Sequence, residues 1–148
     1  MPKILVIHRP SLNLLGQREW SIYGKTTLAQ INRELSRLAK TEKSSVDFFQ
    51  SNHEGVLVDK IQEADDLHYD AVVINPAAFT HTSVAIRDAI AAIRIPVVEV
   101  HLSNIQAREP FRKESYVSAV ARGVIFGFGK ESYLLGLRGA IALCRKKK

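Results

Sequence analysis

The sequence is poor in several features that mark whole classes of protein. Its one cysteine, Cys144, excludes an internal disulfide. No apolar run reaches the ~18 residues that a membrane-spanning helix requires. The stretch "MPK" leads directly into "ILVIH", which is too short for a secretory signal with a cleavage site. These absences predict a cytoplasmic protein with no membrane partner.

The positive charge is concentrated at one end of the chain. The formal net charge is +6, and the last four residues, "RKKK", carry four of these charges, which leaves 6 − 4 = +2 for residues 1–144. A nucleic-acid interface usually combines a basic face with interleaved aromatic side chains. We therefore expect no nucleic-acid partner, and we expect the basic tail, residues 145–148, to be solvated and frayed.

Strand-like and helix-like segments alternate along a chain whose length suits a single domain, residues 1–148. Apolar runs predict strands over residues 3–8, 46–51, 70–76, 96–102 and 122–129. Helical periodicity predicts helices over residues 26–40, 53–67, 82–93 and 131–148. Thr26 or Thr27 can cap the first helix, Asn52 the second, and Thr82 or Ser83 the third. Residues 103–119 look irregular.

This alternation predicts the fold class. Mostly apolar strands separated by helices form a parallel sheet covered on both faces, and right-handed crossovers favour a flavodoxin-like, doubly wound α/β order. Ligands of such sheets bind beyond the carboxyl ends of the strands. The informative residues should therefore lie within 9–24, 75–83 and 101–112.

The stretch Gly24-Lys25-Thr26 resembles the end of a nucleotide-binding phosphate loop, but the rest of the motif is missing. The first glycine of that motif would stand at position 19, which is Glu19. Trp20 and Tyr23 would also crowd a backbone nest for anions. These residues exclude a phosphate loop.

Two interpretations of this loop stay open. Glycines at both ends, Gly16 and Gly24, suit a hinged lid over residues 16–24 that carries Arg18 and Tyr23. Alternatively, it is a surface loop whose Trp20 and Tyr23 pack against the body of the protein.

Polar residues follow the third and fourth strands. Asn75 and His81 come after the third strand, where His81 can also be an ordinary loop histidine. In the fourth strand Glu99 and His101 are two residues apart, so both project from the same face, and Glu99 can fix the tautomer of His101. Ionisable residues in an apolar strand are costly unless they are paired or functional.

Cations and backbone donors follow the same strand. Arg108 and Arg112 can bind an anionic ligand, and the N–H groups of Leu102 and Ser103 can hold a carboxylate.

Together these side chains suit proton abstraction next to a carbonyl group. The chain has no metal-binding motif and no nucleophile elbow. A tyrosine beside an arginine suggests a phenolate base, and lowering its pKa of about 10 by ~2–3 units needs roughly 3–4 kcal/mol of preferential stabilisation of the anion. His101 would then be the acid for a departing hydroxyl group.

Several stretches resemble the type II 3-dehydroquinate dehydratases, in order and over nearly the whole chain. They are "LNLLGQRE", "IYGKTTL", "QSNHEG", "INPAAFTHTSVAIRDA", "VEVHLSN" and "REPFRKESY". The resemblance implies a flavodoxin-like subunit of a dodecamer built from four trimers. It also implies cofactor-free removal of water from 3-dehydroquinate to give 3-dehydroshikimate, in chorismate and aromatic amino-acid biosynthesis or in quinate breakdown.

The resemblance also implies a role for each matching residue. Tyr23 would accept the proton from carbon 2, giving an enolate, while Arg18 on the lid stabilises the transition state. His101, oriented by Glu99, would protonate the leaving hydroxyl. The implied substrate-binding residues are Asn75, His81, Arg112, the backbone of Leu102 and Ser103, and Asp88, which would reach into a neighbouring subunit.

The chain departs from the family pattern "NGPNLNLLG" after its first strand, where it reads "HRPSLNLLG". His8 and Arg9 replace asparagine and glycine, and Trp20 replaces a proline in the lid. Ser11 replaces an asparagine that holds a water near the enolate oxygen, and its single hydroxyl is shorter. These departures motivate an alternative hypothesis, a binding module on the same scaffold that retains ligand affinity without turnover.

Overall fold

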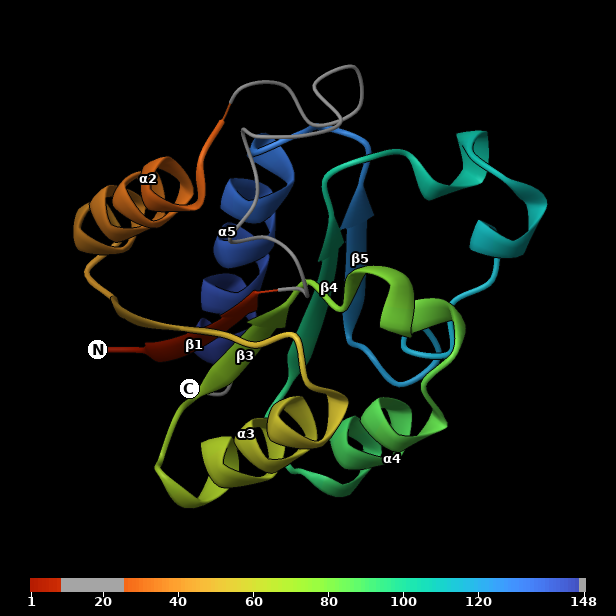
Figure 1. The fold of residues 1–148 in the computed structure, drawn as a ribbon. Coiled ribbons are helices and arrows are strands. Elements are labelled where there is room, and N and C mark those ends of the chain that lie inside the picture. Colours follow the sequence, from red (N-terminus) through yellow and green to blue (C-terminus); the bar gives the residue numbers. More distant parts are fainter. Residues whose placement is uncertain (9–25, 147–148) are drawn as a thin grey trace.

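The computed structural model describes residues 1–8 and 26–146, and within them the chain forms one parallel sheet of five strands (Figure 1). The strand order is β2-β1-β3-β4-β5. The strands are β1 (Lys3–His8), β2 (Ser45–Gln50), β3 (Ala71–Ile74), β4 (Val97–His101) and β5 (Gly123–Phe126). The predicted flavodoxin-like order is confirmed, and each predicted strand is present with slightly different ends.

Two helices cover each face of the sheet (Figure 1). Helices α2 (Leu28–Thr41) and α5 (Glu131–Arg145) lie on one face, and α3 (Glu54–Asp66) and α4 (Val84–Ala92) lie on the other. Alternate strand residues point to opposite faces, so Val100 packs toward α5 while Glu99 and His101 point to the α3/α4 side. None of the helices in the described part of the chain is long and apolar enough to cross a bilayer.

The helix α5 lies unusually close to the sheet at Gly136. A methyl group on Gly136 would overlap Val100 Cγ1 of β4. Glycine therefore permits the close approach that brings Leu137 and Ala140 into the core beside it.

The helix caps agree with the sequence prediction at two of three positions. Thr27 forms a capping box with Gln30 at the start of α2, and Ser83 Oγ accepts from Ile86 N at the start of α4. The prediction that Asn52 caps α3 is wrong. The capping position is His53, whose N–H donates to Ser51 Oγ, because the chain turns one residue later than the pattern suggested.

The prediction that residues 145–148 are frayed is wrong for Arg145. Arg145 belongs to α5, and its guanidinium donates to the carbonyl oxygen of Glu42 at 2.7 Å and to the Glu42 carboxylate at 3.4 Å. Arg138, two turns earlier, donates to the same carboxylate. Because these contacts join the ends of α2 and α5, part of the basic charge stabilises the fold. Residues 147–148 lie outside the described residues.

Three short 3-10 helices lie beyond the carboxyl ends of β3 and β4. They are η2 (Ala77–His81), η3 (Ile105–Ala107) and η4 (Pro110–Arg112). The sequence predicted only loop or irregular structure there. These turns cover the carboxyl edge of the sheet on the α3/α4 side, where the candidate site residues lie (Figure 1).

Candidate active site

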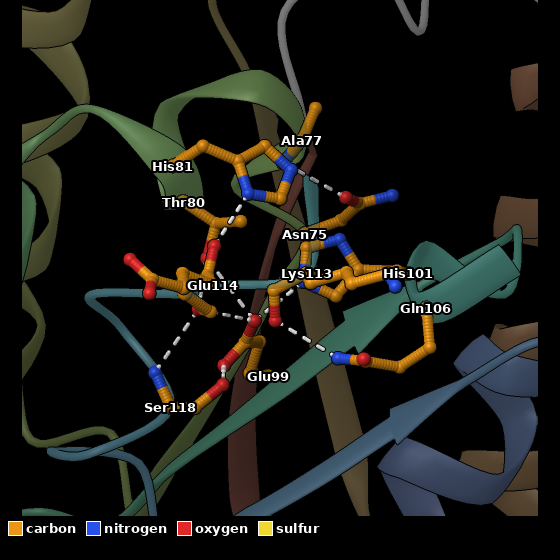
Figure 2. Close-up of polar contacts among 11 residues, drawn as sticks. Asn75, Ala77, Thr80, His81, Glu99, His101, Gln106, Lys113, Glu114 and Ser118 are labelled. Carbon is orange, nitrogen blue, oxygen red and sulfur yellow. Dashed lines mark hydrogen bonds and ion pairs between the residues drawn. The ribbon is translucent and has the colours of Figure 1, made fainter. Parts of the chain in front are cut away.

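The parallel register places the polar ends of β3 and β4 side by side. Ile74 is paired with Glu99, and Asn75 directly follows Ile74. Asn75, Glu99 and His101 are all buried, with 2%, 0% and 4% of their surface exposed. Figure 2 shows them converging with η2 and with the segment of residues 112–118, which we call the site strap. The sequence prediction that Glu99 and His101 share one face is confirmed by their contact.

Glu99 and His101 form a tightly coupled buried pair. The distance from His101 Nε2 to Glu99 Oε2 is 2.5 Å. Burial by itself would raise the pKa of the Glu99 carboxyl, but the hydrogen bond and charge of His101 and the hydroxyls of Ser118 and Ser115 outweigh it and hold the pKa below its usual range. Because a carboxylate only accepts, Nε2 carries the hydrogen of this bond and Nδ1 is the ring atom that can serve a ligand.

Three hydroxyl groups complete the surroundings of the Glu99 carboxylate. Ser118 Oγ lies 2.7 Å from Oε1, and Ser115 Oγ and Thr80 Oγ1 lie 2.9 and 3.1 Å from Oε2. Thr80 belongs to η2, whereas the two serines belong to the site strap. The carboxylate therefore joins β4 to both segments that cover the site.

Asn75 offers a single unsatisfied donor to the site. Its Oδ1 accepts from Ala77 N at 3.1 Å, which orients the amide and leaves Nδ2 buried without a partner among the described residues. Ala77 adopts a positive φ of 50°, a conformation that non-glycine residues rarely adopt. Buried donors are normally satisfied, so an unpaired Nδ2 indicates a place for a ligand acceptor.

His81 is oriented by the backbone of the site strap. Its Nδ1 lies 2.6 Å from the carbonyl oxygen of Glu114. Since a carbonyl oxygen can only accept, Nδ1 carries the hydrogen and Nε2 is left as an acceptor in the neutral ring. Burial lowers the pKa of His81, which favours this neutral form.

The two candidate arginines both contact Glu109. Arg112 Nε donates to Glu109 Oε2 at 2.6 Å, and Arg108 Nε lies 3.9 Å from Oε1. The hydrogen bond from Arg112 holds the pKa of the Glu109 carboxyl below its usual range. An anionic ligand therefore has to share these cations with Glu109, a partner that the sequence analysis did not identify.

The remaining predicted residues either lie apart from this buried cluster or fall outside the described residues. Leu102 and Ser103 directly follow β4, so their backbone lies at the sheet edge as expected. Asp88 is exposed on α4 and has no polar contact with the cluster among the described residues. Ser11, Arg18 and Tyr23, and the lid over residues 16–24 that carries the last two, lie outside the described residues.

No group of three or more His, Cys, Asp or Glu side chains in residues 1–8 and 26–146 is placed to hold a metal ion. The cluster instead offers an imidazole, a paired carboxylate, an amide donor and a second imidazole acceptor. These groups can transfer a proton to a ligand and bind its hydroxyl groups.

Comparison with known proteins places the chain in a family. The sequence profile of the family described as dehydroquinase class II matches residues 2–141, almost the whole chain. The chain belongs to the class II dehydroquinase family.

Relatives and solved structures of this family are similar throughout. The chain is 59% identical to the 3-dehydroquinate dehydratase of Acaryochloris marina over 140 residues, which cover 95% of this chain and 93% of that protein. It is 60% identical to the 3-dehydroquinate dehydratase of Geotalea daltonii over 136 residues, or 92% and 94% of the two chains. The type II dehydroquinase from Butyrivibrio crossotus superposes with a TM-score of 0.92 at 44% identity, covering 94% and 97%.

One departure from the family pattern has a structural explanation. His8 ends β1 on the α2/α5 face, where it is 1% exposed and stacks on Phe48. Its Nε2 lies 2.7 Å from Asn32 Oδ1, and its Nδ1 lies 3.0 Å from the hydroxyl of Tyr133. His8 therefore joins β1 to both helices of that face instead of facing the Glu99–His101 pair on the other. Arg9, Ser11 and Trp20 lie outside the described residues.

The hydroxyl residues that surround Glu99 were not predicted from the sequence. Thr80, Ser115 and Ser118 have no distinctive spacing relative to Glu99, because the three hydroxyls come from two separate segments. The one local signal is the spacing of Ser115 and Ser118, since Ser118 N donates to Ser115 Oγ in a turn.

Proposed function

We propose that this chain is a 3-dehydroquinate dehydratase, a cofactor-independent hydro-lyase that converts 3-dehydroquinate to 3-dehydroshikimate in the shikimate pathway. The observation that carries the proposal is the buried Glu99–His101 pair at the carboxyl end of β4, together with Asn75 Nδ2, which has no partner within residues 1–8 and 26–146. Membership of the class II dehydroquinase family supports the same reaction.

The reaction is a trans-elimination of water in two proton transfers. Tyr23, as the phenolate, removes the proton from carbon 2, and the electrons of the broken C–H bond move into an enolate that Arg18 stabilises. The enolate then collapses to a carbon–carbon double bond as the C–O bond to the leaving hydroxyl breaks. His101 in its imidazolium form gives its Nδ1 proton to that hydroxyl, which departs as water, while Glu99 holds Nε2.

The other residues bind the substrate. Asn75 Nδ2 donates to one substrate hydroxyl, and His81 Nε2 accepts from another. Arg112 binds a further substrate hydroxyl, the backbone N–H groups of Leu102 and Ser103 hold the carboxylate, and Ser11 stands where an asparagine of the family holds a water near the enolate oxygen. Together with Tyr23, Arg18, His101 and Glu99 these residues form the proposed site.

The proposed assembly is a cytoplasmic dodecamer of four trimers, each subunit being a single domain with a lid over residues 16–24. The exposed position of Asp88 on α4 supports this assembly, because a carboxylate outside its own cluster is free to complete a neighbour's site. Light scattering of the purified protein tests the stoichiometry, and a monomer with full activity would contradict it.

Incubation of the purified protein with 3-dehydroquinate tests the activity through the ultraviolet absorbance of the enone product. Tyr23→Phe should lower kcat by at least about 100-fold while substrate binding is largely kept, since general-base catalysis contributes about 10²–10⁴-fold. Tyr69→Phe is the matched control. The Tyr69 hydroxyl donates to Asp47, and Tyr69 precedes β3, so it lies at the amino ends of the strands, away from the site. Tight binding without turnover by the wild-type protein would favour the binding-module hypothesis instead.

A further inference from the structure

The two oxygens of the Glu99 carboxylate have unequal support. Oε2 lies within hydrogen-bond distance of His101 Nε2, Ser115 Oγ and Thr80 Oγ1. Oε1 receives a bond from Ser118 Oγ at 2.7 Å, its one donor among the described residues. Loss of Ser118 would therefore leave a fully buried carboxylate oxygen without a donor, which is costly.

The hydrogen atoms of the hydroxyl groups can be assigned by counting. Thr80 Oγ1 and Ser115 Oγ are 2.5 Å apart, so one of them donates to the other. The second hydroxyl of this pair then donates to Oε2, and Ser115 also accepts from Ser118 N at 3.2 Å. With the His101 Nε2–H and the Ser118 hydroxyl added, every one of these donors has an acceptor when Glu99 is ionised.

The site strap, which supplies the two serine hydroxyls, also forms a hydrogen bond with His81, a proposed substrate-binding residue. Ser115 and Ser118 are three positions apart, and Ser115 directly follows Glu114, whose carbonyl oxygen orients His81. Tyr116 N donates to the carbonyl oxygen of Thr80 at 2.8 Å. The strap is therefore fixed to η2 on one side and to Glu99 on the other.

We propose that Ser118 is a positioning residue for the acid His101, acting through Glu99, with the Thr80–Ser115 hydroxyl pair as the second support. Ser118 holds the carboxylate ionised and in one rotamer, and the carboxylate holds Nε2 so that Nδ1 is presented to the leaving hydroxyl. This inference rests on the proposed function for the kinetic role of His101, but the ionisation of Glu99 can be tested without turnover.

The experiment compares three variants of the full-length protein. Ser118→Ala removes the donor, Ser118→Thr keeps a hydroxyl, and Ser132→Ala removes a fully buried hydroxyl that bonds Phe128 N at the start of α5. Because a hydrogen bond to a charged group is involved, kcat of Ser118→Ala should fall about 10-fold with KM kept within about twofold. Ser118→Thr should recover most of kcat, and Ser132→Ala should retain it.

The second measurement follows the protonation of Glu99 directly. Infrared spectra of protein labelled with ¹³C-glutamate, taken as a difference from Glu99→Gln, give the pH midpoint at which the Glu99 carboxyl becomes protonated. In Ser118→Ala the midpoint should rise by about one pH unit, which is equivalent to the expected tenfold effect. The apparent pKa on the acid side of the kcat–pH profile should increase by the same amount.

A midpoint that does not move in Ser118→Ala overturns the proposal, whether or not kcat falls. A raised midpoint with an unchanged kcat also overturns it, because the ionisation of Glu99 would then not control the acid. If the wild-type protein does not turn over 3-dehydroquinate, the proposed function fails, while the infrared midpoint still decides whether Ser118 keeps Glu99 ionised.

Discussion

Protonation of His8 is expected to destabilise this protein as the pH falls below 6.5. The buried ring fits its partners as the neutral tautomer in which Nε2–H donates to Asn32 Oδ1 and Nδ1 accepts from the Tyr133 hydroxyl. Burial lowers the pKa of His8 from 6.5 to about 4, a decrease that the hydrogen bond to Asn32 only partly opposes. The unfolded chain therefore takes up the proton at a higher pH than the folded protein.

The magnitude follows from the difference between the two pKa values. At about 1.4 kcal/mol per pH unit, a fall from 6.5 to about 4 amounts to about 3 kcal/mol of unfolding free energy. This stability is fully present above pH 6.5 and is lost as the pH falls toward 4, since the unfolded state binds more protons in that window. Between pH 7 and pH 5 the expected loss is about 2 kcal/mol.

Urea unfolding followed by circular dichroism at pH 7 and pH 5 measures this loss, with the protein concentration held fixed because subunit association also affects stability. His8→Asn removes the titrating ring and should lessen the decrease by about 2 kcal/mol. His68→Asn is the matched control, because His68 is exposed and has a positive φ that asparagine tolerates. Equal pH dependence of His8→Asn and the wild-type protein would refute the reasoning.

Two further predictions concern α5. Gly136→Ala should lower the unfolding free energy by about 1–3 kcal/mol, because the new methyl group overlaps Val100. Gly139→Ala, in the same helix with open space around it, should instead gain up to about 1 kcal/mol, and urea midpoints that fall equally for both would contradict the packing argument. Glu42→Gln should cost less than about 1 kcal/mol and lose most of this effect in high salt, since its bonds to Arg145 are partly exposed; a cost independent of salt would contradict an ionic contact.

The fold was largely predictable because its signals are local. The apolar runs of β1, β3 and β4 and the helical spacing of Leu28, Ile31 and Leu35 are read from neighbouring residues, and the structure confirms each of these elements. Short turns were not predictable in the same way. The 3-10 helix η2 is bonded to a distant segment, through the hydrogen bond from Tyr116 N to Thr80 O.

In the candidate site, too, the features set by a local pattern were predictable and the others were not. The pairing of Glu99 and His101 was predictable, because two residues of one strand must share a face whatever surrounds them. The contact of Arg112 with Glu109 was missed, although the two are close in sequence, because no pattern specifies which partner a surface arginine takes. The roles assigned to Tyr23, Arg18 and Ser11 stay predictions.

The sequence by itself determined the order of strands and helices, the parallel sheet and the face on which Glu99 and His101 lie, because periodicity and connection length act over a few residues. Only the tertiary structure decided that Ser118 and Thr80 bond the Glu99 carboxylate and that His8 lies between α2 and α5. Those contacts join residues 19 or more positions apart. Such contacts form when the sheet and its covering segments assemble, so no local pattern specifies them.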